Sequence, residues 1–194
     1  VEYTHLALIP TYTEPLETLR HTVRALAEAD WPTERKICAI ITRQTDEAGI
    51  ANVAALPAER VAVLAQWGRA GGGILVAPGD HVDPAAYDRT MLPLLPQGLR
   101  DPIDTTWGAT PDDRASRALH LVKWEADHPI FTPFSQSAPE LADAAFYKVS
   151  LLGPTTDSRD RKVLARFTNG AAALVEASLG AGRTRLVSQL LTEG

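Results

Sequence analysis

The sequence predicts an α/β fold: helices cover both faces of a mostly parallel sheet, and an antiparallel β-hairpin lies near the C-terminus. Short apolar runs without polar alternation, such as residues 74–77, indicate strands that are buried on both faces. These runs alternate with segments of helical periodicity, which is the pattern of parallel crossover units. Turn residues at 168–170 indicate the hairpin. The expected architecture is a three-layer sheet of the flavodoxin-like or Rossmann-like type.

The composition is that of one soluble globular domain. At 194 residues the chain is long enough for one sizeable core and short for two. Its formal net charge is −5 and its basic residues are scattered, which argues against a nucleic acid as partner. No stretch reaches the roughly 20 apolar residues of a membrane span, and the N-terminus has no charged and hydrophobic leader. We therefore expect a soluble segment without direct membrane insertion, and a chain that starts without methionine is compatible with an excised piece.

The first part of the chain predicts a strand, a helix and a second strand. Residues 6–9 are an apolar run that ends at Pro10, and residues 37–41 form the second run. The intervening helix is indicated by apolar residues at helical spacing, with Thr13 as its N-cap: Leu16, Leu19, Val23 and Leu26. It should end near Asp30, before Trp31-Pro32. Residues 50–56 fit either a short strand or a loop.

The segment from Val61 to Pro84 is the centre of the predicted sheet. Its first part has apolar residues at helical spacing, and the glycines at 71–73 supply the positive φ that ends a helix. The buried strand 74–77 should follow. Asp83 can cap a further helix that begins at Pro84 and stops at Pro96 to Gly98.

The last part of the chain changes character. Residues 99–113 show no period and indicate a surface excursion, whereas 119–124 fit either a strand or a short helix. Residues 145–152 are strand-like. Residues 163–167 and 172–176 should pair as the hairpin, before 184–191 return to the main sheet.

Candidate binding residues follow the strand 74–77, because ligands in open α/β sheets bind at the carboxyl ends of strands. Asp80 and His81 are possible ligands of a metal ion, but they also suit a turn and a solvent-facing loop. A catalytic cysteine on a sharp strand-to-helix turn would lie at this corner, where the chain has Pro78-Gly79-Asp80. The one cysteine, Cys38, lies in another predicted strand and suits a small buried hydrophobe. We therefore predict no catalytic residue, no metal site and no cofactor.

Several motifs between residue 50 and the C-terminus occur in the order typical of one family. They are residues 51–56, 69–76, 78–84 with Tyr87, 92–96, 128–131 and 180–183. With them the chain resembles the class I glutamine-amidotransferase-like domain of BatA-type bacterial membrane proteins. The resemblance implies a noncatalytic structural or interaction module that associates with protein partners or with other domains of its parent. It also implies that the parent is a bacterial cell-envelope protein, anchored in the membrane outside this segment.

The first 48 residues carry a different resemblance. Residues 9–15, 19–22 and 30–37 are similar to the first strand, the helix and the approach to the second strand of family 2 glycosyltransferases. This resemblance implies that Thr11, Glu14 and Asp46 bind a sugar nucleotide, which is the alternative function. The chain departs from that family because it has no Asp-x-Asp metal motif. We expect a single α/β domain over 1–194, composed of a glycosyltransferase-like start (1–48) and an amidotransferase-like region (49–194).

Overall fold

The structure is a computed structural model of the whole chain. It describes the residue ranges 5–10, 16–30, 36–41, 58–78, 83–110, 113–134, 138–154 and 159–188. The candidate residues Thr11, Glu14, Asp46, Asp80 and His81 lie outside these ranges, as do Thr13 and residues 50–56.

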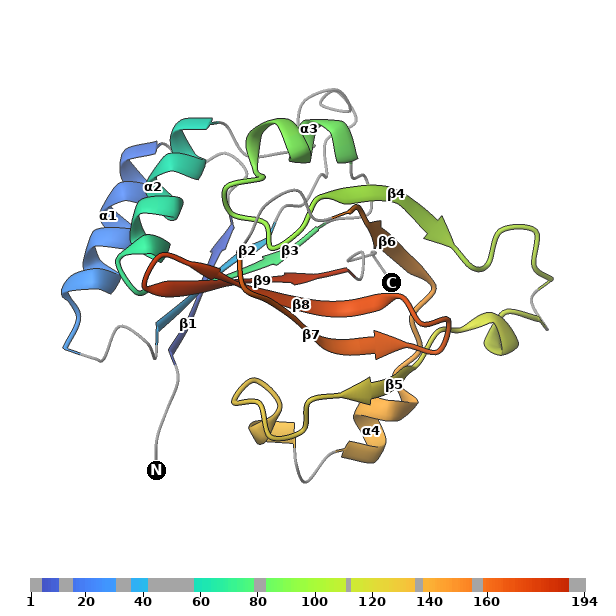
Figure 1. Cartoon of the computed structure of the whole chain (residues 1–194). Helices are drawn as coiled ribbons and strands as arrows, with labels where there is room; N and C mark the ends of the chain where they lie inside the picture. Colours follow the sequence, from blue (N-terminus) through green and yellow to red (C-terminus); the bar gives the residue numbers. More distant parts are fainter. Residues whose placement is uncertain are drawn as a thin grey trace.

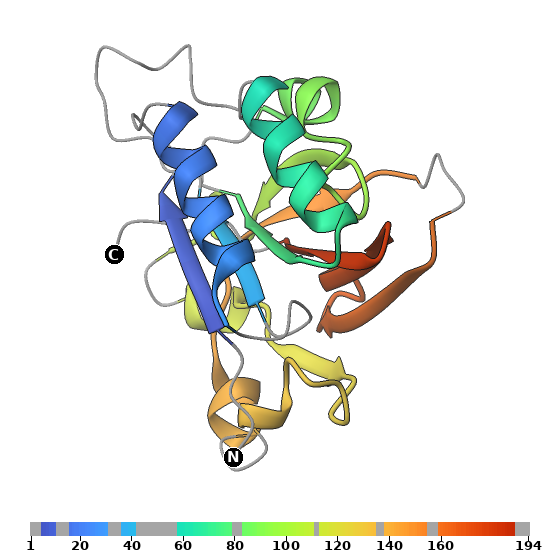
Figure 2. The same ribbon diagram turned by 90° about the vertical axis from the view of Figure 1, so that its left-hand side faces the viewer.

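The N-terminal part has the predicted strand, helix, strand pattern. Its elements are β1 (His5–Pro10), α1 (Leu16–Glu28), β2 (Lys36–Ile41), α2 (Ala58–Arg69) and β3 (Gly73–Ala77). Strand β2 pairs in parallel with β1 on one side and with β3 on the other. Helices α1 and α2 lie side by side over this parallel part of the sheet (Figures 1 and 2). The predicted crossover unit is therefore confirmed.

The middle of the chain is less regular. Its helices are α3 (Pro84–Thr90) and the six-residue α4 (Ala138–Asp143), and its strands are β4 (Leu99–Asp104), β5 (Leu121–Trp124) and β6 (Lys148–Leu152). The carboxylate of Asp83 accepts hydrogen bonds from the backbone N–H groups of Ala85 and Ala86, which confirms it as the N-cap of α3. This helix ends at Thr90, earlier than predicted, because the chain turns at residues 91–94 and buries Leu94 and Leu95.

The described residues of 99–113 lie largely at the surface, as predicted, but the first half of this segment is a strand and not an irregular excursion. Strand β4 pairs antiparallel with β6 in a separate two-stranded sheet. The pairing shifts register between Leu99 and Pro102, and Pro102 has no backbone N–H to donate. An irregular strand of this kind lacks the alternation of apolar and polar residues, so its sequence does not resemble a strand.

The C-terminal part is a meander of β7 (Arg161–Phe167), β8 (Ala172–Leu179) and β9 (Gly182–Val187). Strands β7 and β8 form the predicted antiparallel hairpin, with Gly170 at φ 83° in its turn. A second tight turn joins β8 to β9, and β9 then pairs in parallel with β3. The expected return of the chain to the main sheet is thus confirmed for residues 184–187.

The prediction of a mostly parallel, three-layer fold is wrong. The seven described strands of the main sheet follow the order β1-β2-β3-β9-β8-β7-β5. Its three pairings between β1 and β9 are parallel, and the three from β9 to β5 are antiparallel. With β4 and β6 added, antiparallel pairings outnumber parallel ones among the described strands. The reason is connection length, because tight turns join only antiparallel strands, whereas a parallel pair needs a long crossover.

The two faces of the main sheet are covered differently. Helices α1, α2 and α3 pack on one face, and the short α4 lies on the opposite side, next to β5 (Figure 1). Ile74 and Val76 of β3 are fully buried under the three helices, whereas Leu75 between them is half-buried against a second apolar cluster. The expectation that strand 74–77 is buried on both faces is therefore corrected to one face. No described helix is long and apolar enough to span a bilayer.

A contact between two glycine-containing turns joins the parallel part to the meander. Gly71 has φ 115° in the turn from α2 to β3, as the run of glycines predicted. The N–H of Ala181 donates to the carbonyl oxygen of Arg69 over 3.0 Å. A Cβ on Gly180, whose φ is 61°, would lie 2.7 Å from the Cα of Arg69. A Cβ on Gly182 would collide with the carbonyl oxygens of Gly68 and Gly72.

The close approach at Gly180 gives a stability prediction. Gly180→Ala should destabilise the fold through both its positive φ and the contact with Arg69. Gly108 is the matched control, because its φ is 68° and a Cβ there would have no neighbour within 4 Å. Gly108→Ala should cost about 1–2 kcal/mol for the backbone conformation alone. Gly180→Ala should cost about 1–3 kcal/mol more. Urea unfolding measures the destabilisation by each variant. Equal destabilisation would contradict the close contact between the two turns.

Candidate functional site

The three strands that precede the predicted binding residues in the sequence end at one edge of the sheet. Pro10, Ile41 and Ala77 are the last residues of β1, β2 and β3, and they are adjacent in the parallel register. In the sequence the candidate residues follow these strand ends, and all five lie outside the described residues. The assignments of Thr11, Glu14 and Asp46 to a sugar nucleotide, and of Asp80 and His81 to a ligand, therefore stay predictions.

Cys38 lies within β2, away from the end of that strand. Its neighbours in register are Ala7 of β1 and Ile74 of β3, three positions before the pair formed by Ile41 and Ala77. The described residues contain no group of three or more His, Cys, Asp or Glu side chains placed to hold a metal ion.

An ion cluster with a buried glutamate at its centre lies on the face of the sheet opposite α1 and α2. Glu176 of β8 is its centre, with only 6% of its side chain exposed. Arg185 of β9 lies 2.6 Å from one carboxylate oxygen of Glu176, and Arg183 lies 3.2 Å from the other. The Nε2 atom of His128 is 3.4 Å from Glu176 Oε2. We call Glu176, Arg183, Arg185 and His128 the ion cluster.

The strands position this cluster through their register. Glu176 pairs with Arg185 across the β8–β9 ladder, and Leu174 pairs with Val187 two residues further on. Residues two apart on a strand share a face, so the charged pair and the apolar pair lie on the same side of the sheet. The sequence contains one signal of this cluster. Glu176 interrupts the apolar run 171–177, and Arg183 and Arg185 follow at alternate positions. Sequence reasoning missed it because the signal becomes informative only when the two strands are paired.

Residues 125–131, which we call the covering segment, bring His128 to the cluster. Lys162 of β7 forms a 2.8 Å ion pair with Glu125 at the start of this segment. The N–H of Ile130 donates to Nδ1 of His128 over 3.3 Å. Because Nδ1 accepts this bond, the ring proton is on Nε2 and faces Glu176. The hydrogen bond from Ile130 therefore assigns the neutral form of His128.

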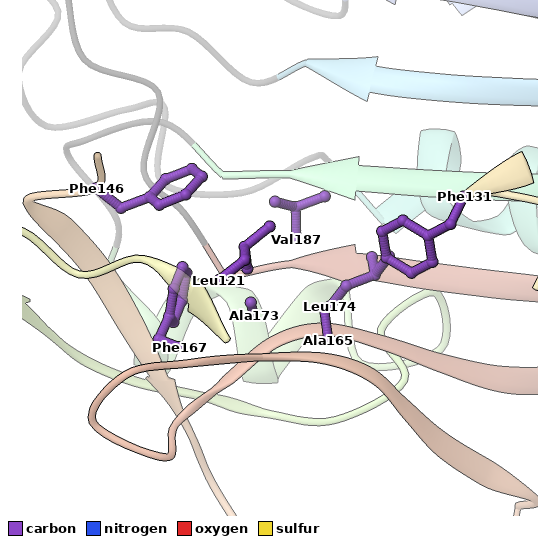
Figure 3. A pocket seen from close by; sticks show the side chains of 8 residues that line it. All are labelled: Leu121, Phe131, Phe146, Ala165, Phe167, Ala173, Leu174 and Val187. Carbon is purple, nitrogen blue, oxygen red and sulfur yellow. The ribbon is translucent and has the colours of Figure 1, made fainter. Parts of the chain in front are cut away.

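Next to the ion cluster lies an apolar cavity of about 160 Å³ that is partly open to the surface (Figure 3). Its wall is formed by side chains of β5, β7, β8 and β9, by Phe131 of the covering segment and by Phe146, which precedes β6. The lining residues are Leu121, Phe131, Phe146, Ala165, Phe167, Ala173, Leu174 and Val187. Phe131 is 8% exposed and closes one side of the cavity. The covering segment thus contacts the ion cluster through His128 and the cavity through Phe131.

Comparisons with known proteins inform the fold alone. No protein-family model and no curated protein matches the sequence. The chain is similar to the cytoplasmic protein STM3548 from Salmonella typhimurium, with a TM-score of 0.56 and 13% identity over 96% of this chain and 87% of that one. The cytoplasmic protein STM1381 from Salmonella typhimurium LT2 has a TM-score of 0.54 and 15% identity over 94% and 78%.

A third similar structure is that of a much longer protein. The exo-β-1,4-mannosidase Op5Man5 from Opitutaceae bacterium strain TAV5 matches 96% of this chain at a TM-score of 0.50 and 15% identity. The match covers 31% of the mannosidase chain, so a similar fold forms one part of that protein. At these identities the similarities establish a shared fold and no shared activity.

The burial of Glu176 predicts a large cost for removing its charge. Glu176→Gln should lower the free energy of unfolding by about 3–5 kcal/mol, because Arg185 then stays buried without a counter-charge. Glu17→Gln is the matched control, since Glu17 pairs with Arg20 on the surface of α1 and 79% of its side chain is exposed. That control should leave the urea midpoint nearly unchanged. Similar midpoints for the two variants would refute the structural role of the cluster.

His128 predicts a pH dependence of stability. Burial lowers the pKa of His128, and the nearby Arg185 and Lys162 lower it further, while Glu176 opposes the shift. The ordinary pKa of histidine is about 6.5. Below this pH, His128 binds a proton in the unfolded chain before it does so in the folded chain. The free energy of unfolding should consequently fall as the pH drops below about 6.5.

His128→Gln should remove this part of the pH dependence. Urea unfolding between about pH 7.5 and about pH 5 measures it, since this window spans the ordinary pKa of histidine. Hydrogen bonds from Thr106 lower the pKa of Asp104. The stability that ionised Asp104 contributes is lost only at a lower pH than that of His128, so Asp104 does not affect this measurement. An unchanged slope in His128→Gln would contradict the assigned role of His128.

Proposed function

We propose that this chain is a noncatalytic interaction domain that binds a protein partner or another part of its parent protein. The observation that carries the proposal is Trp107, whose side chain is 86% exposed. Tryptophan is enriched among the residues that dominate binding energy at protein interfaces. A large apolar side chain held in water is therefore a candidate anchor for a partner.

The turn that carries Trp107 is held by hydrogen bonds. Asp104 accepts two of them from Thr106, over 2.8 Å from its N–H and 2.6 Å from its hydroxyl. The guanidinium of Arg117 donates to the carbonyl oxygen of Trp107 over 3.2 Å, and the N–H of Thr105 donates to Tyr147. This turn follows β4 and projects from the body of the protein (Figure 1). A held turn loses little conformational entropy on binding, which favours a role in recognition.

The mannosidase similarity supports a role within a larger protein, because there a similar fold makes up 31% of the chain. The motif resemblance over residues 50–194 is the basis for proposing an amidotransferase-like module whose parent is a BatA-type protein of the bacterial cell envelope. A membrane anchor would then lie in the parent outside this segment.

Site-specific crosslinking tests the interaction. A photo-reactive benzoylphenylalanine at position 107 of the intact parent, expressed in its own cells, should give a discrete crosslinked protein. The same residue at position 122 is the control, because Val122 is also exposed, at 57%. Excess wild-type domain should compete for the partner, and Trp107→Ala should compete about 30-fold less well if Trp107 is an interface anchor. No crosslink at 107, or equal competition by the variant, would refute the proposal.

Ligand titration tests the alternative, a sugar-nucleotide-binding fragment. Under the interaction proposal, nucleoside diphosphate sugars with or without manganese leave the thermal midpoint unchanged. A ligand selective for the folded state raises its stability. A rise in the midpoint that Glu14→Ala abolishes would therefore favour the alternative over the proposed function.

A further inference from the structure

The apolar cavity is already formed by the packed chain. Phe167 and Ala165 are 1% and 3% exposed, and Leu174 is 8% exposed, so the strands hold these parts of the wall in place. A preformed site loses little conformational entropy when a ligand binds. The volume of about 160 Å³ is close to the roughly 150 Å³ of an engineered apolar cavity that stays dry and binds benzene. The volume therefore matches a ligand of one small ring.

The wall favours an aromatic ligand. Three phenylalanines from different parts of the chain, Phe131, Phe146 and Phe167, line the cavity (Figure 3). The rings of Phe146 and Phe167 are tilted by 57° with centroids 5.3 Å apart. Aromatic rings prefer tilted or offset neighbours, because their faces carry partial negative charge and their edges partial positive charge. A ring in the cavity can make the same type of contact with these side chains.

The wall also favours an uncharged ligand. All eight lining side chains are apolar, and the ion cluster is separated from them by two residues along β8 and β9. Arg183 and Arg185, the two arginines of β9, already form ion pairs with the carboxylate of Glu176. A charged group inside the cavity would lose part of its hydration without gaining a partner, which is costly.

We propose that the apolar cavity is a binding site for a small neutral aromatic molecule of about the size of benzene or toluene. The site is independent of the Trp107 turn, so its test and that of the interaction proposal give separate answers. The covering segment forms part of the site, because its last residue, Phe131, lines the cavity.

Fluorine NMR with fluorobenzene as the probe tests the site on the whole chain. The probe signal should broaden with the wild-type protein, and excess toluene should reverse the broadening. Ala173→Leu fills the cavity from β8 and should abolish the effect. Ala62→Leu is the matched control, because it makes the same change at an exposed position of α2 and should keep full binding.

Three results would overturn the proposal. They are no broadening with the wild-type protein, equal broadening with Ala173→Leu, and displacement of fluorobenzene by benzoate as effectively as by toluene. If Ala173→Leu fails to fold, the smaller change Ala165→Val replaces it, and at least a fivefold loss of affinity is then expected. Unchanged affinity in a folded Ala165→Val would overturn the proposal as well.

Discussion

The close backbone contact between two turns is the constraint on which the sheet depends. The chain leaves α2 through Gly71 and Gly72, and the turn from β8 to β9 packs directly on that exit. A side chain on Gly182 would collide with the carbonyl oxygens of Gly68 and Gly72 and push β9 away from β3. Since β9 is the strand that joins the parallel part to the meander, this contact lets one sheet continue across two kinds of pairing.

The two faces of the sheet have different chemistry. The face under α1, α2 and α3 is an apolar core in which Ile74, Val76 and Leu186 are fully buried. The opposite face combines the apolar cavity with the ion cluster. A buried charge is costly unless it is paired, so Glu176 favours the one arrangement that places Arg185 opposite it. We interpret the cluster as a device that selects the register of β8 and β9 and holds the covering segment.

The proposed functions follow from particular side chains and not from the fold. Similar folds occur in two cytoplasmic proteins from Salmonella and in one part of a mannosidase, so the architecture is compatible with different roles. The exposed Trp107 and the cavity beside Phe131 are features of this chain that a partner or a ligand can contact. They lie at different places in the fold, which allows two independent binding events.

The sequence by itself determined the local structure. The helical spacing of Leu19 and Val23, the cap formed by Asp83 and the turns at Gly71 and Gly170 depend on residues close together in the chain, and all were predictable. Tertiary structure alone decided which strands pair, because apolar patterns show that a strand is buried and not which strand lies beside it. That is why the mixed sheet, the pairing of β4 with β6 and the ion cluster were missed: each joins segments whose partners only the folded chain brings together.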